Sequence, residues 1–251
     1  MELMKLSTRE AREAPSQARV AVLPIGAIEQ HGPHLPLGTD WFTSLHIASE
    51  VSERGGRLLL PGIPVGVSRE HRQFWGTLTL TPTQLEDQAK ALAQSLATHD
   101  LRRIVFVNGH ATNCAPLEAA ARELREEGTY AFVFNWWQSL SALLAELFPQ
   151  PTAHAGSLET SIMLAIHPEL VQPELFTEAS SVAQWGKYVE GVLVGFDAAD
   201  FTSQGNVGDP RLGSAEKGNA VLSAAINKLG RFCDWLADQS DQDLAPRSHM
   251  A

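Results

Sequence analysis

The apolar run VAVLPI (residues 20–25) leads closely into the polar segment EQHGPHLPLGTD (residues 29–40). A short continuous apolar run that ends beside a glycine is typical of a buried β-strand. The segment after it holds Glu29, His31, His34 and Asp40. Carboxylates and imidazoles gathered in one loop suit zinc, manganese or iron better than calcium or copper(I). This stretch therefore predicts a strand that opens onto a metal site.

Further apolar runs of strand length alternate with helical patterns along the chain. The predicted strands are residues 19–25, 57–60, 103–107 and 130–134, and the predicted helices are residues 42–53, 82–99, 115–127, 158–166 and 214–238. Strands separated by helices of this length are typical of βαβ units. We therefore predict an α/β fold, a three-layer α/β/α sandwich with a mostly parallel central sheet.

The length of 251 residues is enough for one domain with a full core. We predict a single catalytic domain over residues 1–238. Residues 239–251 are polar and carry no helical pattern, so we predict a disordered tail there.

Composition excludes several classes of protein. A net charge of −10 argues against binding to nucleic acid, which requires a basic face. We expect no membrane association, because no apolar run approaches the length of a membrane-spanning helix and the N-terminus lacks the apolar stretch of a signal peptide. Two cysteines, Cys114 and Cys233, make no disulfide framework and favour a cytoplasmic location. Dinucleotide, P-loop and nucleophile-elbow motifs are absent.

Two more polar clusters stand where they could meet the first. Asn108, Gly109 and His110 directly follow the predicted strand 103–107, and His154 and Glu159 precede or open the predicted helix 158–166. Ligands of open α/β sheets bind outside the carboxyl ends of the strands. We therefore expect these clusters to converge at one edge of the sheet.

The same clusters resemble the motifs of the creatininase family. The matching stretches are PIGAIEQHGPHLPLGTD (24–40), VGVSREH (65–71), FWGT (74–77), VNGH (107–110), HAGSLET (154–160) and GNVGDP (205–210). They occur in the family's order and span roughly residues 18–230. The resemblance implies the three-layer α/β/α fold, a homohexamer and a dinuclear metal hydrolase that acts on a small-molecule amide substrate.

The resemblance also implies a ligand set for two divalent ions, which we expect to be zinc, manganese or iron. Asp40 would bridge the two ions, Glu29 and His110 would complete one site, and His31 and Glu159 would complete the other. A hydroxide between the ions would attack the carbonyl carbon of a linear or cyclic amide.

Other residues are assigned to proton transfer and to the substrate. His154 is the candidate general acid that protonates the leaving nitrogen. Ser68, His71, Gly109 and Trp137 are the candidate substrate-binding residues.

The sequence departs from the family pattern at Thr112. Relatives that hydrolyse creatinine carry a glutamate ligand at this position, so Thr112 argues against creatinine as the substrate. We expect Glu159 to supply the missing carboxylate.

Alternatives remain open at this stage. Glu159 could be favoured in the first turn of its helix by the dipole alone, and His154 could act as a hydrogen-bonding neighbour of the ligands. The enzyme could be a deformylase or a small-peptide-trimming relative with the same metal pair. The chain could also be a non-catalytic metal-binding scaffold, which turnover on a panel of amides would exclude.

Overall fold

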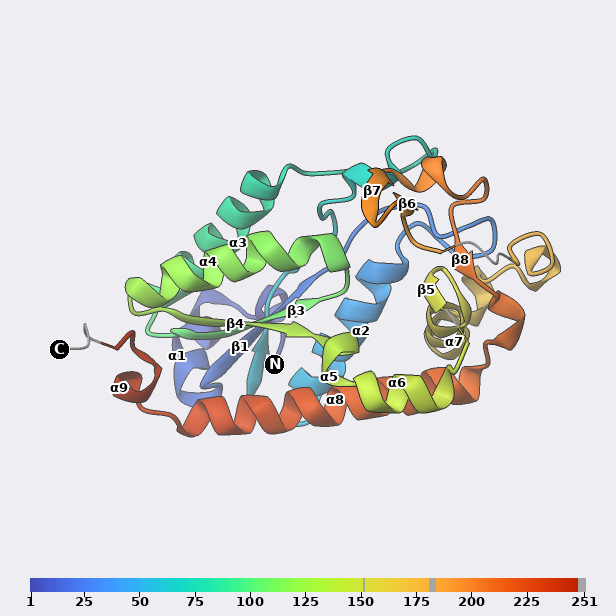
Figure 1. Cartoon of the computed structure of the whole chain (residues 1–251). Coiled ribbons are helices and arrows are strands. Elements are labelled where there is room, and N and C mark those ends of the chain that lie inside the picture. The colour runs from blue at the N-terminus through green and yellow to red at the C-terminus, as the bar shows by residue number, and fades with distance from the viewer. Residues whose placement is uncertain (151, 181–183, 248–251) are drawn as a thin grey trace.

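A computed structural model describes residues 1–150, 152–180 and 184–247 (Figure 1). Its central sheet has four parallel strands in the order β2-β1-β3-β4. Their bounds are Val20–Ile25 for β1, Arg57–Leu59 for β2, Arg103–Asn108 for β3 and Tyr130–Asn135 for β4. Ile25 pairs with Asn108, and Asn108 with Asn135, so three strands end at the same level. The prediction of a mostly parallel sheet is confirmed.

Helices cover both faces of this sheet, because both faces of its strands are apolar. Val22 and Val105 belong to one core cluster, with side chains of α2 (Thr39–Glu53) and α8 (Ala215–Asp238). Leu23 and Phe106 belong to a second cluster, with side chains of α3 (Pro82–Ala97) and α4 (Cys114–Glu126). Figure 1 shows α3 and α4 on one side of the strands and α8 on the other. The predicted three-layer α/β/α arrangement is therefore confirmed.

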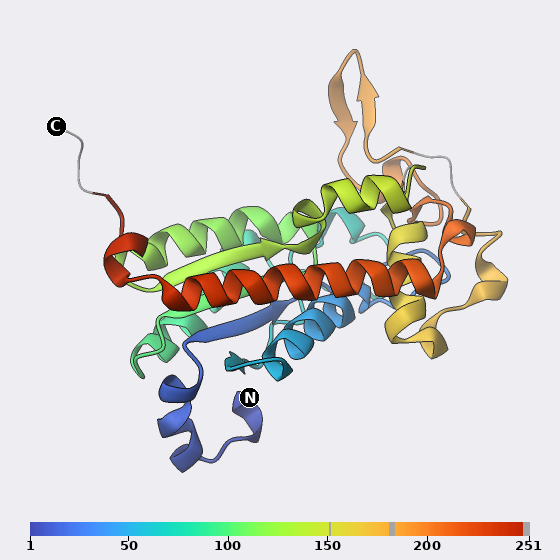
Figure 2. The same ribbon diagram turned by 90° about the horizontal axis from the view of Figure 1, so that it is seen from below.

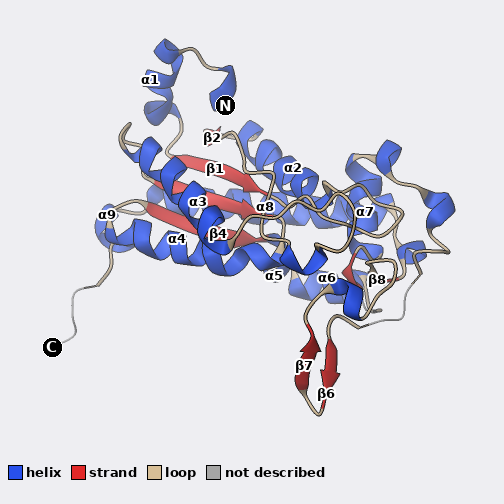
Figure 3. Ribbon diagram, turned by 90° about the horizontal axis from the view of Figure 1, so that it is seen from above, coloured by secondary structure: helices blue, strands red, loops and turns tan. Residues whose placement is uncertain are grey.

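The remaining elements lie around the two ends of the sheet or extend from the body (Figure 1). The short helices are α1 (Thr8–Gln17), α5 (Trp136–Ser139), α6 (Ser141–Leu147), α7 (Ser157–Ile166) and α9 (Asp241–Leu244). β5 (Thr152–His154) pairs with β8 (Val207–Gly208), and β6 (Lys187–Val189) pairs with β7 (Val192–Gly195), both antiparallel. The β6–β7 hairpin projects away from the rest of the chain (Figures 2 and 3). Within the described ranges, no helix combines the length and apolarity needed to span a bilayer.

The start of α2 differs from the sequence prediction. We expected a loop up to residue 41, but the helix begins at Thr39 and places Asp40 in its first turn. A carboxylate in the first turn is stabilised by the helix dipole. Asp40 is therefore held on a rigid element.

The C-terminal segment also differs from the prediction over its described part. Leu244 is buried, and α9 follows the end of α8. The guanidinium of Arg103 donates to the Gln239 carbonyl, at 2.8 Å, and that of Arg125 donates to the Leu244 carbonyl, at 2.6 Å. A polar composition predicts a frayed tail, but its backbone carbonyls accept hydrogen bonds from arginines of β3 and α4. Residues 248–251 lie outside the described residues.

We predict that Gly218→Ala destabilises the fold while Gly230→Ala, in the same helix, does not. A Cβ on Gly218 would lie 1.9 Å from the backbone oxygen of Ser161 in α7, whereas a Cβ on Gly230 meets nothing within 4 Å. Overpacking of this kind costs roughly 1–3 kcal/mol, and alanine in an open helical position gains up to about 1 kcal/mol over glycine. Chemical denaturation of the two variants measures both effects, and equal free energies of unfolding would contradict the close approach of α7 and α8.

Candidate metal centre

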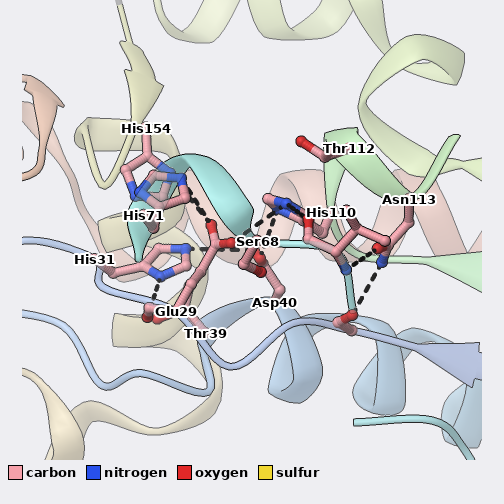
Figure 4. Close-up of polar contacts among 12 residues, drawn as sticks. Glu29, His31, Thr39, Asp40, Ser68, His71, His110, Thr112, Asn113 and His154 are labelled. Carbon is pink, nitrogen blue, oxygen red and sulfur yellow. Dashed lines mark hydrogen bonds and ion pairs between the residues drawn. The ribbon is translucent and has the colours of Figure 1, made fainter. Parts of the chain in front are cut away.

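The carboxyl ends of β1 and β3 bring two of the predicted clusters together. The amide of Gly109 donates to the Ile25 carbonyl at 2.8 Å, which joins the two strand ends. A Cβ on Gly109 would lie 2.3 Å from the backbone oxygen of Asp40, so only glycine lets α2 approach this closely. His154 comes from β5 and Glu159 from the first turn of α7. The expected convergence of the three clusters is thus present (Figure 4).

The five predicted ligands form two groups that share Asp40. Glu29, Asp40 and His110 are one group, and His31, Asp40 and Glu159 are the other. Within each group, ligand atoms lie within 4.8 Å of one another. Asp40 faces the two groups with different oxygens: Oδ1 is 3.3 Å from His31 Nε2, and Oδ2 is 3.1 Å from His110 Nδ1. This arrangement places Asp40 between two positions where a cation could be held.

Each of the two histidines is oriented by a backbone carbonyl. His31 Nδ1 lies 3.2 Å from the Glu29 carbonyl, and His110 Nε2 lies 2.9 Å from the Val67 carbonyl. A ring nitrogen that donates to a carbonyl leaves the other nitrogen with its lone pair, which is the usual arrangement of metal-binding histidines. The Asn113 side chain holds Val67 in place, because its Oδ1 accepts from the Val67 amide at 2.9 Å. In both rings the free nitrogen is the one that faces Asp40.

Four buried polar atoms of this cluster lack a hydrogen-bond partner in the part of the chain that the structure describes. Among the described residues, both carboxylate oxygens of Glu29, the Oδ2 of Asp40 and the Nε2 of His31 make no hydrogen bond. Burying such groups unsatisfied is costly, whereas oxygen and nitrogen ligands of this kind satisfy a divalent cation. The residues therefore fit the metal pair that the sequence predicts.

The raised pKa values of Glu29 and His31 show that positive charge is stabilised in this cluster. Burial raises the pKa of Glu29 to about 8. Burial alone would lower the pKa of His31, but the carboxylates of Asp40, Glu159 and Glu29 raise it to about 10. Without a metal, the cluster holds protons in order to balance its carboxylates.

His71 and His154 form a second pair of imidazoles above the carboxylates. Their rings are stacked with centroids 4.5 Å apart, and Trp185 lies 5.5 Å from each. His71 Nε2 is 3.4 Å from Glu29 Oε1, and His154 Nδ1 is 3.8 Å from the same oxygen. Burial, followed by the charges of His31 and His71, lowers the pKa of His154 well below its usual value. The resting form of His154 is the neutral imidazole.

Gln30 fixes the hydrogen bonding of these two rings, and the sequence reasoning missed it. Its Nε2 donates to the Gly205 carbonyl at 2.8 Å and to His71 Nδ1 at 2.7 Å, and its Oε1 accepts from the Gly32 amide at 2.9 Å. The backbone oxygen of Gln30 accepts from His154 Nε2 at 2.8 Å. His71 therefore presents an N–H to Glu29, and His154 presents a lone pair. The only sequence signal was the position of Gln30 between two predicted ligands.

Glu70 is a further carboxylate that the sequence reasoning did not single out, although it stands directly before His71. Its Oε1 lies 3.5 Å from His110 Nε2 and accepts from the Thr112 hydroxyl. Burial raises the pKa of Glu70, but the bonds to His110 and Thr112 outweigh it and lower the pKa to about 2. We expected Glu159 to replace the carboxylate missing at Thr112; the structure instead places Glu70 there and Glu159 beside His31. Glu70 comes from a distant loop, which spacing alone does not reveal.

A cavity of about 930 Å³ opens onto this cluster. Its polar lining includes the predicted residues Gly109, His71 and His154, and its apolar lining includes Trp137, Leu144, Phe148 and Phe196. Ser68 is fully buried beside Glu29 and is not among the described lining residues. The cavity therefore does not support the predicted contact between Ser68 and a substrate.

Comparison with known proteins agrees with this geometry. The family model described as creatinine amidohydrolase matches residues 4–233. The chain is 32% identical to the mycofactocin precursor peptide peptidase of Mycobacterium ulcerans, over 93% of this chain and 92% of that protein. It is 30% identical to the creatinine amidohydrolase of Pseudomonas putida, over 88% and 90% of the two chains.

Solved structures show the same similarity in space. A crystal structure of creatinine amidohydrolase superposes with a TM-score of 0.82 at 27% identity, covering 95% of this chain and 98% of that one. Two further creatininase structures, with TM-scores of 0.80 and 0.81, are described as an Mn form and a Zn-Zn form. The similarity extends over nearly the whole fold.

We predict that Asp40→Asn loses most of the metal that the wild-type protein binds. The change keeps the shape of the side chain but removes the charge that faces both His31 and His110. Elemental analysis of purified protein measures the metal per chain, with the exposed α3 residue in Asp87→Asn as control. Equal metal content in Asp40→Asn and wild type would contradict a shared carboxylate.

Proposed function

Because the chain belongs to the creatininase family, we propose that it is a metal-dependent amidohydrolase with two divalent cations. One ion would be held by Glu29, Asp40 and His110, and the other by His31, Asp40 and Glu159. The observation that carries this proposal is the position of Asp40, whose two oxygens face two different imidazoles. Zinc, manganese and iron all suit the ligand set.

When bound, two such ions polarise an amide carbonyl and lower the pKa of water toward about 7. The chain's own residues then have separate tasks. His154 Nε2 donates to the Gln30 carbonyl, so His154 Nδ1 is the atom that accepts a proton. The lowered pKa means that His154 enters the reaction neutral. The proton it gives to the leaving nitrogen is one that it has first accepted.

His71 lies beside His154 and faces the same oxygen of Glu29. Gln30 donates to His71 Nδ1, which leaves the Nε2 hydrogen of His71 directed toward the Glu29 carboxylate. The Nε2–Oε1 distance of 3.4 Å places this ring nitrogen beside the carboxylate. Trp185 covers both rings and limits the access of water to them.

The cavity favours a substrate larger than creatinine. A volume of about 930 Å³ is at the upper end of small-molecule sites, and several large apolar side chains line it. We propose an amide with an apolar portion, and a short peptide is the second candidate, since the mycobacterial relative is described as a peptide peptidase. The substrates we propose therefore include short peptides as well as the non-peptide amides expected from the sequence.

We predict that His154→Gln lowers kcat by about 10²–10⁴-fold while metal content stays at the wild-type level. The assay is turnover on a panel of cyclic amides, formyl amides and short peptides with apolar ends. His99→Gln, at an exposed position, is the control. A fully metal-loaded wild-type protein with no turnover on any amide would favour the metal-binding scaffold.

We also propose a homo-oligomer, a hexamer by family resemblance, with the β6–β7 hairpin in the interface. Tyr188, Val189, Val192 and Val194 on this projecting hairpin are exposed. An isolated two-stranded hairpin is at best marginally stable in water, and exposed apolar patches mark interaction sites. A cytoplasmic location remains a prediction, supported by the free thiols of Cys114 and Cys233.

We predict that Val192→Glu combined with Val194→Glu reduces the assembly to a smaller one. Light scattering coupled to gel filtration measures the mass, and Met4→Glu, at an exposed position outside the hairpin, is the control. A wild-type protein with the mass of one chain, 27.3 kDa, would contradict the oligomer. An unchanged mass in the double variant would exclude the hairpin from the interface.

A further inference from the structure

Glu70 has no task in the proposed reaction, yet it faces the metal-binding cluster. It lies in a single 3-10 turn, Arg69–His71, and its side chain is 16% exposed at the cavity wall. Its neighbours fix the turn on both sides. The Ser68 amide donates to Thr79 Oγ1 at 2.9 Å, and the guanidinium of Arg72 pairs with the Asp197 carboxylate. The turn that carries Glu70 is thus held at both of its ends.

The contacts of His110 show what Glu70 can influence. His110 Nδ1 faces Asp40 Oδ2 at 3.1 Å, and this is the nitrogen available to a cation. On the opposite side of the ring, Nε2 donates to the Val67 carbonyl at 2.9 Å and lies 3.3 Å from Glu29 Oε2 and 3.5 Å from Glu70 Oε1. A carboxylate near the far N–H of a ligand imidazole raises its basicity and holds its orientation.

The second ligand histidine lacks such support. The far nitrogen of His31, Nδ1, meets only the neutral carbonyl of Glu29 in the described part of the chain. The two groups of ligands that share Asp40 therefore differ: an additional carboxylate, that of Glu70, lies next to the histidine of one group only.

We propose that Glu70 is a positioning residue that strengthens cation binding at the Glu29, Asp40 and His110 group by acting through His110. Thr112 holds Glu70 for this task, because its hydroxyl donates to Glu70 Oε1. The inference rests on the proposed metal pair. It gives Thr112 a role in this chain, as the residue that directs a carboxylate from another loop toward His110.

The test is a titration of metal-free protein with Zn²⁺ in competition with a chromophoric chelator. It yields the number of ions bound and a Kd for each. Loss of the Glu70 charge should raise the Kd of one ion by about 10–100-fold and leave the Kd of the other unchanged. Glu70→Gln is the main variant, and Glu169→Gln is the control, since Glu169 lies 3.0 Å from an exposed histidine, His167, outside the cluster.

The Thr112 variants separate positioning from a general loss of structure. Thr112→Val should raise the Kd of the same ion, whereas Thr112→Ser, which keeps the hydroxyl, should bind it with the wild-type Kd. The double variant Glu70→Gln with Thr112→Val should have the same Kd for this ion as Glu70→Gln alone. The thermal midpoint of each metal-free variant shows that it is folded. Unchanged Kd values in Glu70→Gln, or equal weakening of both ions, would overturn the inference. A wild-type protein that binds fewer than two ions would instead overturn the proposed metal pair.

Discussion

The carboxylate of Asp40, buried between His31 and His110, is the interaction on which the rest of the site depends. It sits in the first turn of α2, and α2 packs on the sheet through the same face that builds one of the two cores. Gly109 permits that packing, because any side chain there would collide with the Asp40 backbone. The position of the Asp40 carboxylate thus depends on α2, on the end of β3 and on Gly109. The imidazoles and the other carboxylates are arranged around it.

The fold was largely predictable because its strongest signals are local. The runs at β1 and β3 are apolar on both faces, which is the pattern of a central parallel strand, and the helices between them follow the usual spacing. The five proposed ligands were assigned from the resemblance of their motifs to those of the creatininase family, and each follows a strand or opens a helix. The start of α2 was misplaced because Thr39 and Asp40 were assigned to the polar loop before it. The tail was misplaced because its order depends on Arg103 and Arg125, which are far away in the sequence.

The residues that the sequence did not reveal are those whose roles come from contacts between loops. Gln30 reaches His71 across 41 residues and Gly205 across 175, and Glu70 reaches Thr112 across 42. Ser68 is the opposite case. Its place in a family motif suggested a substrate contact, but its side chain is buried. The substrate is similarly a property of the assembled cavity, whose apolar lining is contributed by α5, α6 and the base of the hairpin. Pattern alone identifies ligand chemistry here, but not the volume around it.

The long-range bonds of Gln30 have a consequence for how the chain acquires its metal. They join the loop after β1 to segments near residues 71, 154 and 205, so the site is complete only when almost the whole chain has folded. Contacts of such large sequence separation form at a high cost in loop-closure entropy. Until cations arrive, bound protons balance the cluster's carboxylates. Each ion present at 100 times its Kd adds about 2.7 kcal/mol to the stability of the folded state. Cation supply should therefore govern how long newly made chains persist in the cell as well as how fast they turn over substrate.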